Sequence, residues 1–232
     1  MRLHRFYVNA PITSETFDVT DKDLIHQWKS VFRYNVGSQV IAFDGSGTDY
    51  LCLISSSRNS GATLAVVLKM PGGEKPKRDL WLCLGLIKKD NFELAVEKAV
   101  EIGATHIIPV LCERSEKKKL NMERLHKIII ETAEQSGRGD IPTIYNIIEL
   151  PQLLDGNLLP NRAIFMNLEG VGIDTVKNDD PKELAVFIGP EGGWGDLEVK
   201  NFALHNIPAI SLGTQVLRAE TAAIAISSLL LL

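Results

Sequence analysis

The sequence has few cysteines and no long uninterrupted apolar run. Its three cysteines, Cys52, Cys83 and Cys112, include no Cys-x-x-Cys pair, which argues against a disulfide framework or a zinc module and fits a reducing compartment. The amino-terminal residues lack the apolar core of a signal peptide. The apolar run at residues 222–232 is interrupted by two serines and is shorter than the roughly 20 residues that a membrane-spanning helix needs. We therefore expect a soluble cytoplasmic protein.

Several common catalytic and nucleotide-binding motifs are also missing. The sequence contains neither G-x-G-x-x-G nor G-x-x-x-x-G-K-[ST], and Gly170-Val-Gly172 has Thr175 where a third glycine would stand. This disfavours a Rossmann dinucleotide site and a P-loop. There is no G-x-S-x-G elbow and no His-Glu-x-x-His helix, and the five histidines are scattered. We therefore expect no metal site.

Charge is distributed unevenly along the chain. The net charge is −4, yet residues 143–232 contain 5 Lys and Arg against 11 Asp and Glu, whereas residues 1–142 contain 20 against 18. Such asymmetry is compatible with one face that meets a polyanion, and equally with an ordinary solvated surface. Charge alone leaves both interpretations open.

A segment rich in proline, glycine and charge, residues 70–78, divides the chain into two parts. Before it, short stretches rich in β-branched and aromatic residues predict strands around one helix at residues 23–33, which together favour a small barrel. The predicted strands are residues 5–8, 39–43, 50–55 and 63–70. We expect residues 1–72 to form a barrel domain and residues 73–232 a second domain.

Apolar runs and helical stripes alternate in the second part. Residues 80–87 read as a strand buried on both faces, and the apolar spacing across residues 92–100 is typical of an amphipathic helix. Further strands are predicted at residues 104–111, 143–148, 163–168, 184–188 and 209–212, and helices at residues 122–133, capped by Asn121, and from residue 219 onward. This alternation predicts an α/β domain with a mostly parallel sheet and helices on both faces.

Glycine-bearing loops follow three of these strands. They are Glu169-Gly-Val-Gly172, Gly189-Pro-Glu-Gly-Gly-Trp194 and the segment that opens at Gly213. Ligands of open parallel sheets bind beyond the carboxyl ends of the strands, and glycine lets the backbone approach a ligand closely. The loops predict a pocket for a flat, polar cofactor, although strand-to-helix turns are often rich in glycine for structural reasons alone.

Two of these loops resemble signature segments of a known family. Gly189-Pro-Glu-Gly-Gly193 and residues 212–222 (LGTQVLRAETA) resemble the cofactor loops of the RsmE family, SPOUT-class methyltransferases that act on 16S ribosomal RNA. Residues 97–103 (EKAVEIG), 113–115 (ERS) and 134–138 (EQSGR) resemble further family segments, as do residues 4–8 and 31–33. The resemblance extends over nearly the whole chain, in order.

The resemblance implies an α/β fold with a trefoil-knotted SPOUT methyltransferase domain, contrary to the general rule that chains do not knot, and a small N-terminal PUA-like β-barrel that binds RNA. It implies a homodimer that transfers a methyl group from S-adenosyl-L-methionine to N3 of a uridine in small-subunit (16S) rRNA or the 30S particle, without metal or membrane. Alternatives are a SPOUT enzyme with another target, such as a tRNA ribose 2′-OH, a non-catalytic RNA-binding or ribosome-assembly factor, and an ordinary nucleotide-binding enzyme.

Carried over by residue, the resemblance assigns cofactor binding to Leu168, Gly170, Gly189, Glu191, Gly192, Gly193, Leu212, Gly213, Val216 and Leu217. It indicates Arg218 as catalytic, because uridine N3 must lose a proton and a guanidinium, although a poor base, can stabilise the resulting anion. A plainer role for Arg218 is to close a turn by bonding to carbonyls. Glu220 is also expected at the catalytic site, where it would either orient Arg218 or cap the next helix.

RNA contacts are expected from the more basic part of the chain, with the lysines at 117–119 adding non-specific attraction to phosphates. The candidates are Arg5, Arg33, Lys88, Lys89, Arg114 and Arg138. The sequence departs from the family pattern at Gly195, where relatives carry Ser or Thr; we expect Asp196 to cap the following helix instead. It departs again at Lys88-Lys-Asp90, which lacks the usual glycine.

Overall fold

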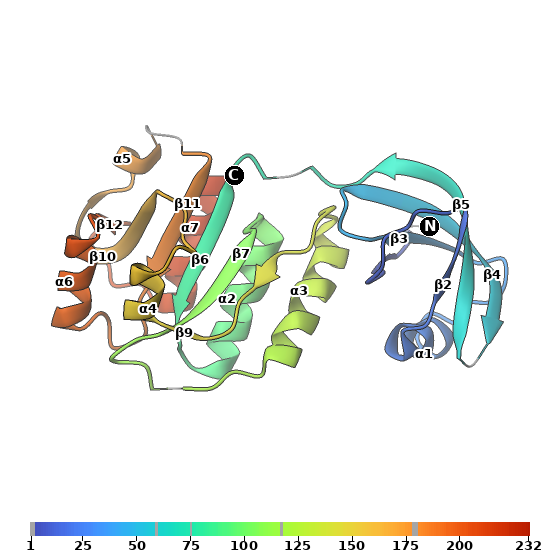
Figure 1. The fold of residues 1–232 in the computed structure, drawn as a ribbon, viewed down its shortest axis with the longest axis horizontal. Helices are drawn as coiled ribbons and strands as arrows, with labels where there is room; N and C mark the ends of the chain where they lie inside the picture. The colour runs from blue at the N-terminus through green and yellow to red at the C-terminus, as the bar shows by residue number, and fades with distance from the viewer. Residues whose placement is uncertain (1–2, 59, 75, 117, 178–180) are drawn as a thin grey trace. The chain divides into compact units, whose positions relative to one another are not determined.

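The chain folds into two units, and each unit is made of two stretches that are separate in the sequence (Figure 1). The structure, a computed structural model, describes residues 3–58, 60–74, 76–116, 118–177 and 181–232, so Lys117 of the lysine cluster lies outside the described residues. The first unit comprises residues 1–75 and 133–141, and the second residues 76–132 and 142–232. Residues 133–141 thus belong with the first unit, far from it in sequence.

The first unit contains a five-stranded sheet in the order β1-β3-β4-β5-β2. Its elements are β1 (Arg5–Tyr7), β2 (Thr16–Val19), α1 (Lys22–Ser30), β3 (Gln39–Phe43), β4 (Thr48–Arg58) and β5 (Gly61–Pro71). All neighbours pair antiparallel except β1 and β3, which are parallel. The short β2 was not expected from the sequence, because its TFDV carries only two apolar residues; it forms by pairing with β5. Phe6, Trp28 and Leu64 lie in the shared apolar core.

Arg5 connects residues 133–141 to this sheet. Its Nε and Nη2 donate to the two carboxylate oxygens of Asp49 at 2.8 and 2.7 Å. Its Nη1 and Nη2 also donate to the carbonyl oxygens of Ala133 and Arg138, both at 3.1 Å, and its guanidinium lies 4.1 Å from the centre of the Phe43 ring. One arginine therefore joins β1, β4 and the distant segment.

The second unit is built on a sheet in the order β12-β10-β11-β6-β7-β8, with β9 paired to β7 and every pairing parallel. Its strands are β6 (Asp79–Gly85), β7 (His106–Leu111), β8 (Thr143–Ile144), β9 (Ile148–Glu149), β10 (Ala163–Gly172), β11 (Glu183–Ile188) and β12 (Ala209–Ser211). Its helices are α2 (Lys89–Ile102), α3 (Met122–Ser136, which ends in the first unit), α4 (Leu150–Asp155), α5 (Asp174–Lys177), α6 (Asp196–Leu204) and α7 (Ala219–Leu231). The predicted parallel α/β sheet is confirmed.

Helices cover both faces of this sheet, as predicted. On one face, Leu153 of α4 and Phe202 of α6 pack with Cys83 and Phe187 of the sheet. On the other, α7 contacts α2, β6 and β11 (Figure 1). Among the described helices, none is both long and apolar enough to cross a membrane.

All three cysteines are buried and unpaired. Burial raises the pKa of the Cys52 thiol to about 11, and it raises the pKa of the Cys83 and Cys112 thiols as well. Thiols that are buried and protonated are poor nucleophiles. The cysteines therefore act as small apolar side chains of the two cores.

Two predicted helix caps had different outcomes. Asn121 caps α3 as predicted, because its Oδ1 accepts a hydrogen bond from the Arg124 N–H at 3.0 Å. The predicted cap at Asp196 is wrong, since α6 already begins there and Gly195 is the N-cap residue. The Glu198 carboxylate reaches back to accept from the Gly195 N–H at 2.8 Å. A buried carboxylate three residues along the chain thus replaces the missing hydroxyl.

The order of the strands determines where the chain crosses the sheet. β12 lies at the edge, next to β10, whereas α7 packs on β6 and β11. After β12 the chain must therefore pass over the carboxyl ends of β10 and β11 before α7 begins. Residues 212–218 make this crossing, and they carry the second of the two signature segments.

Candidate active site

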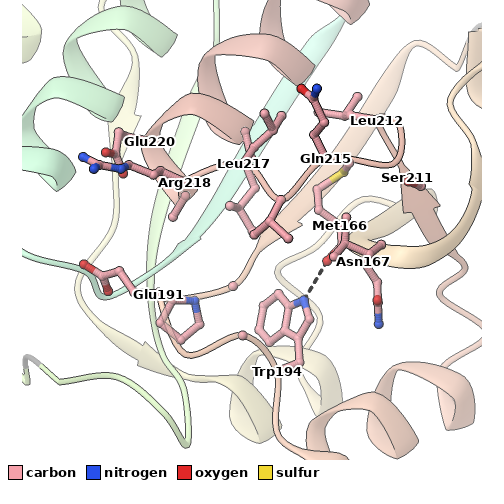
Figure 2. Close-up of a pocket in the computed structure, with 18 of the residues that line it drawn as sticks. Met166, Asn167, Glu191, Trp194, Ser211, Leu212, Gln215, Leu217, Arg218 and Glu220 are labelled. Atoms are coloured by element: carbon pink, nitrogen blue, oxygen red, sulfur yellow. Dashed lines mark hydrogen bonds between the residues drawn. The ribbon is translucent and has the colours of Figure 1, made fainter.

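A bulge within β10 and the segments at the ends of β11 and β12 line one pocket of about 620 Å³ (Figure 2). They contribute residues 166–168, 188–191, 193–194, 210–213, 215–220 and 222, while Lys88, Asn91 and Arg114 complete the wall from the segments after β6 and β7. The volume suits a drug-sized or nucleoside-sized ligand. The pocket lies at the carboxyl ends of parallel strands, where the sequence predicted it.

A bulge in β10 brings its residues into the pocket. Ile210 of β12 is in register with both Met166 and Val171, so residues 167–170 project out of the strand. Asn167 and Leu168 thereby line the pocket. Gly170 closes the bulge, because a Cβ at this position would lie only 2.5 Å from the backbone nitrogen of Ile210.

Replacing Gly170 by alanine is expected to destabilise the second unit by about 1–3 kcal/mol, since the new methyl group would collide with the backbone of β12. Gly172→Ala is the matched control: it lies on the same strand, and a Cβ there would meet nothing within 4 Å. Urea unfolding of both variants measures the difference. Equal stability of the two variants would contradict this role for Gly170.

The loop after β11 is held tightly against its neighbours. Gly193 has a φ of +69°, which favours glycine. The Trp194 indole N–H donates to the Met166 carbonyl oxygen at 2.9 Å (Figure 2), which connects this loop to β10. The Glu191 carboxylate accepts from the backbone N–H of Lys88 at 3.0 Å, which connects it to the start of α2. Three pocket segments are therefore fixed relative to one another.

The crossing segment after β12 presents unused donors and apolar side chains. Gly213 turns the chain at a φ of +135°. In the described part of the chain, no hydrogen bond is formed by the backbone N–H groups of Leu212, Val216 and Leu217. The Val216 side chain is 82% exposed. A flat ligand with a polar edge is the kind of molecule that would satisfy both features.

Charged side chains collect at one side of the pocket. Figure 2 shows Glu191, Arg218 and Glu220 at this side, whereas Met166 and Leu212 lie at the other. Arg218 is the exposed N-cap residue of α7, and Glu220 is the second residue of that helix. Neither expected role of Glu220 is observed, because its side chain forms no hydrogen bond and no ion pair within the described residues.

The structure brings most of the predicted cofactor residues together. Eight of the ten line the pocket: Leu168, Gly189, Glu191, Gly193, Leu212, Gly213, Val216 and Leu217. Gly170 and Gly192 do not; the Gly192 carbonyl oxygen instead accepts from Arg114 Nη1 at 3.0 Å. Sequence analysis did not assign Met166, Asn167, Trp194, Ser211 and Gln215. Trp194 and Gln215 stand inside the recognised loops, but Met166 and Asn167 enter the pocket only through the bulge.

The predicted RNA-binding residues fall into three groups. Lys88 and Arg114 line the pocket, and Arg33 and Lys89 are exposed elsewhere. Arg138 is buried and the Arg5 side chain is 10% exposed, and they form ion pairs with Asp140 and Asp49 at 2.9 and 2.7 Å. The Arg5 side chain joins β1, β4 and residues 133–141, whereas the Arg138 ion pair lies within that segment. RNA binding by any of the six stays a prediction.

Comparison with known proteins identifies the family. A family model described as an RNA methyltransferase domain matches residues 74–231. The ribosomal RNA small subunit methyltransferase E of Rickettsia conorii is 32% identical over 97% of this chain and 93% of its own length. The chain belongs to the RsmE family of RNA methyltransferases. The RsmE protein of Bacillus subtilis is 29% identical over 89% of this chain and 86% of its own.

Solved RsmE structures share the fold. The RsmE protein of Neisseria gonorrhoeae, solved with bound S-adenosylmethionine, matches with a TM-score of 0.88 and 23% identity over 98% of this chain and 96% of that chain. A Legionella pneumophila protein, solved with the same cofactor, also reaches 0.88, with 24% identity over 99% and 97%. The predicted mixed α/β fold, with a barrel-like sheet in the first unit and a parallel sheet in the second, is therefore confirmed. Among the described residues, no group of three or more His, Cys, Asp and Glu side chains could hold a metal ion.

Proposed function

We propose that this RsmE-family chain transfers a methyl group from S-adenosylmethionine to N3 of a uridine in small-subunit ribosomal RNA. The observation that carries the proposal is the pocket at the carboxyl ends of β10, β11 and β12, which places Arg218 beside the predicted cofactor loops. Membership of the RsmE family supplies the reaction class.

The pocket residues fit S-adenosylmethionine. The unused N–H groups of Leu212, Val216 and Leu217 suit the polar edge of an adenine, and the side chains of Leu168 and Val216 offer apolar surface for its ring faces. When bound, the cofactor supplies an electrophilic methyl group attached to a positively charged sulfur. Two related structures contain this cofactor.

Arg218 suits the acceptor side of the reaction. Uridine N3 carries a proton, and its loss leaves negative charge on the base. A guanidinium remains protonated at any working pH, so it stabilises this charge without acting as the base. Within the described residues, the Arg218 side chain forms no hydrogen bond or ion pair, which leaves its donors available for the substrate.

RNA and a second copy of the chain are the proposed partners, and the cytoplasm is the proposed location. We propose that the first unit is a PUA-like RNA-binding domain and that Lys88 and Arg114 guide the RNA to the pocket, with Arg33 and Lys89 adding phosphate contacts. We also propose that the chain forms a homodimer, as the resemblance to the RsmE family implies. A substrate in rRNA or the 30S particle implies a cytoplasmic enzyme.

Methyl transfer tests this function directly. The protein is incubated with labelled S-adenosylmethionine and with 16S rRNA or 30S particles that lack the modification, and the digested nucleosides are separated by mass. Label in 3-methyluridine is expected. Fully modified particles serve as the control, because N3 of their target uridine already carries a methyl group and no label is expected. Label in a 2′-O-methyl nucleoside would overturn the target atom, and absence of label despite cofactor binding would favour a binding factor.

A further inference from the structure

Glu220 is a buried carboxylate that lacks a partner. The residue is 7% exposed, and its Oε2 is inaccessible and forms no hydrogen bond. Among the described side chains that line the pocket, it is the one that carries such an orphaned polar atom. A buried polar group without a partner costs free energy, and a buried charge costs more. A substrate that donates a hydrogen bond to Oε2 would supply the missing partner.

The surrounding structure keeps this carboxylate available. Glu220 lies in the first turn of α7, where the partial positive charge of the helix terminus favours an ionised side chain. No cap hydrogen bond engages it, and the side chain of Arg218 forms no ion pair with it in the described chain. The helix terminus therefore favours the charge, while Oε2 of this pocket-lining side chain stays without a hydrogen-bond partner.

The position of Glu220 indicates which substrate it meets. In Figure 2 it lies with Arg218 and Glu191, away from Met166, Leu212 and the apolar wall proposed for the adenosine. The charged side of the pocket is then left for the acceptor base. A uridine that approaches there brings one N–H donor on the atom to be methylated, and Glu220 offers the unpaired acceptor.

We propose that Glu220 accepts the N3 proton of the target uridine, an inference that rests on the proposed function. The N3–H bond breaks and the proton moves to the Glu220 carboxylate, the N3 electron pair forms the bond to the methyl carbon, and the electrons of the carbon–sulfur bond remain on sulfur. The carboxylate and the positive sulfur are both neutralised, and Glu220 then releases the proton to water. Arg218 stabilises the charge on the base while the proton leaves.

Glu220→Gln tests the proposal, because the amide keeps the shape of the side chain and cannot accept the proton. At saturating cofactor and RNA, the single-turnover rate is expected to fall by about 10²-fold, a typical contribution of a general base. The dissociation constant for S-adenosylmethionine, measured by calorimetry, is expected to stay within about threefold. The melting temperature of the free protein is expected not to fall, since an unpaired buried charge has been removed.

The pH profile separates proton transfer from a structural role. Without a base in the site, hydroxide must remove the N3 proton, so the residual rate of Glu220→Gln is expected to rise about tenfold per pH unit. Glu191→Gln is the matched control, a second carboxylate of the same pocket that already accepts the Lys88 N–H. Any loss of rate in Glu191→Gln is expected to keep the pH dependence of the unmodified protein.

Three results would overturn the proposal. They are an unchanged rate in Glu220→Gln, a reduced rate that does not rise with pH, and a dissociation constant for S-adenosylmethionine that rises by far more than threefold, which would make Glu220 a cofactor ligand. If the unmodified protein transfers no methyl group to uridine, the proposed function itself is wrong. The two failures are therefore distinguishable.

Discussion

Arg218→Ala is expected to lower the single-turnover rate of methyl transfer by about 10²–10³-fold, the usual loss when one donor to a developing anion is removed. The exposed guanidinium stands at the N-cap of α7, on the wall of the pocket. It lies outside both apolar cores, so the variant is expected to fold and to bind S-adenosylmethionine with unchanged affinity. Rapid-quench assays and calorimetry measure the two quantities.

Two further variants sharpen this result. Arg218→Lys keeps the charge but loses the planar fork of donors, so it is expected to recover only part of the rate. Lys200→Ala removes another exposed cation of the second unit, outside the pocket, and is expected to leave the rate unchanged. If Arg218→Ala weakened RNA binding but left the rate at saturating RNA unchanged, Arg218 would bind the RNA without stabilising the reacting base.

Asp49→Ala is expected to destabilise the first unit by about 3–5 kcal/mol, the cost of leaving one member of a buried ion pair without its partner. The side chains of Arg5 and Asp49 are 10% and 12% exposed and meet at 2.7 Å. Without the carboxylate, the guanidinium keeps only its two carbonyl acceptors and the Phe43 ring. The attachment of residues 133–141 is expected to loosen at the same time.

Hydrogen exchange during mild denaturation measures this effect locally. Protection of amides in β3, β4 and residues 133–141 is expected to fall, while protection in β6 and β11 is retained. Asp18→Ala is the control, since that carboxylate is exposed and accepts one hydrogen bond from Thr63; its loss is expected to cost at most about 1 kcal/mol. Equal effects of the two variants would show that the buried pair contributes nothing special.

The position of the pocket and half of the residues that line it were predictable from the sequence. Apolar runs and helical stripes have local periods, and parallel strands end at one edge, so loops that follow different strands must converge. The resemblance of residues 189–193 and 212–222 to RsmE loops then indicated the cofactor. Local patterning was sufficient because each of these segments sits directly after its own strand.

The tertiary structure decided the features that depend on contacts between distant residues. No local pattern shows that Arg5 pairs with Asp49 and holds residues 133–141, or that Gly170 serves a bulge rather than the pocket wall. Glu198, not Asp196, completes the start of α6. The orphaned oxygen of Glu220 is likewise invisible in sequence, because whether a buried group has a partner depends on which distant side chains the fold brings near it.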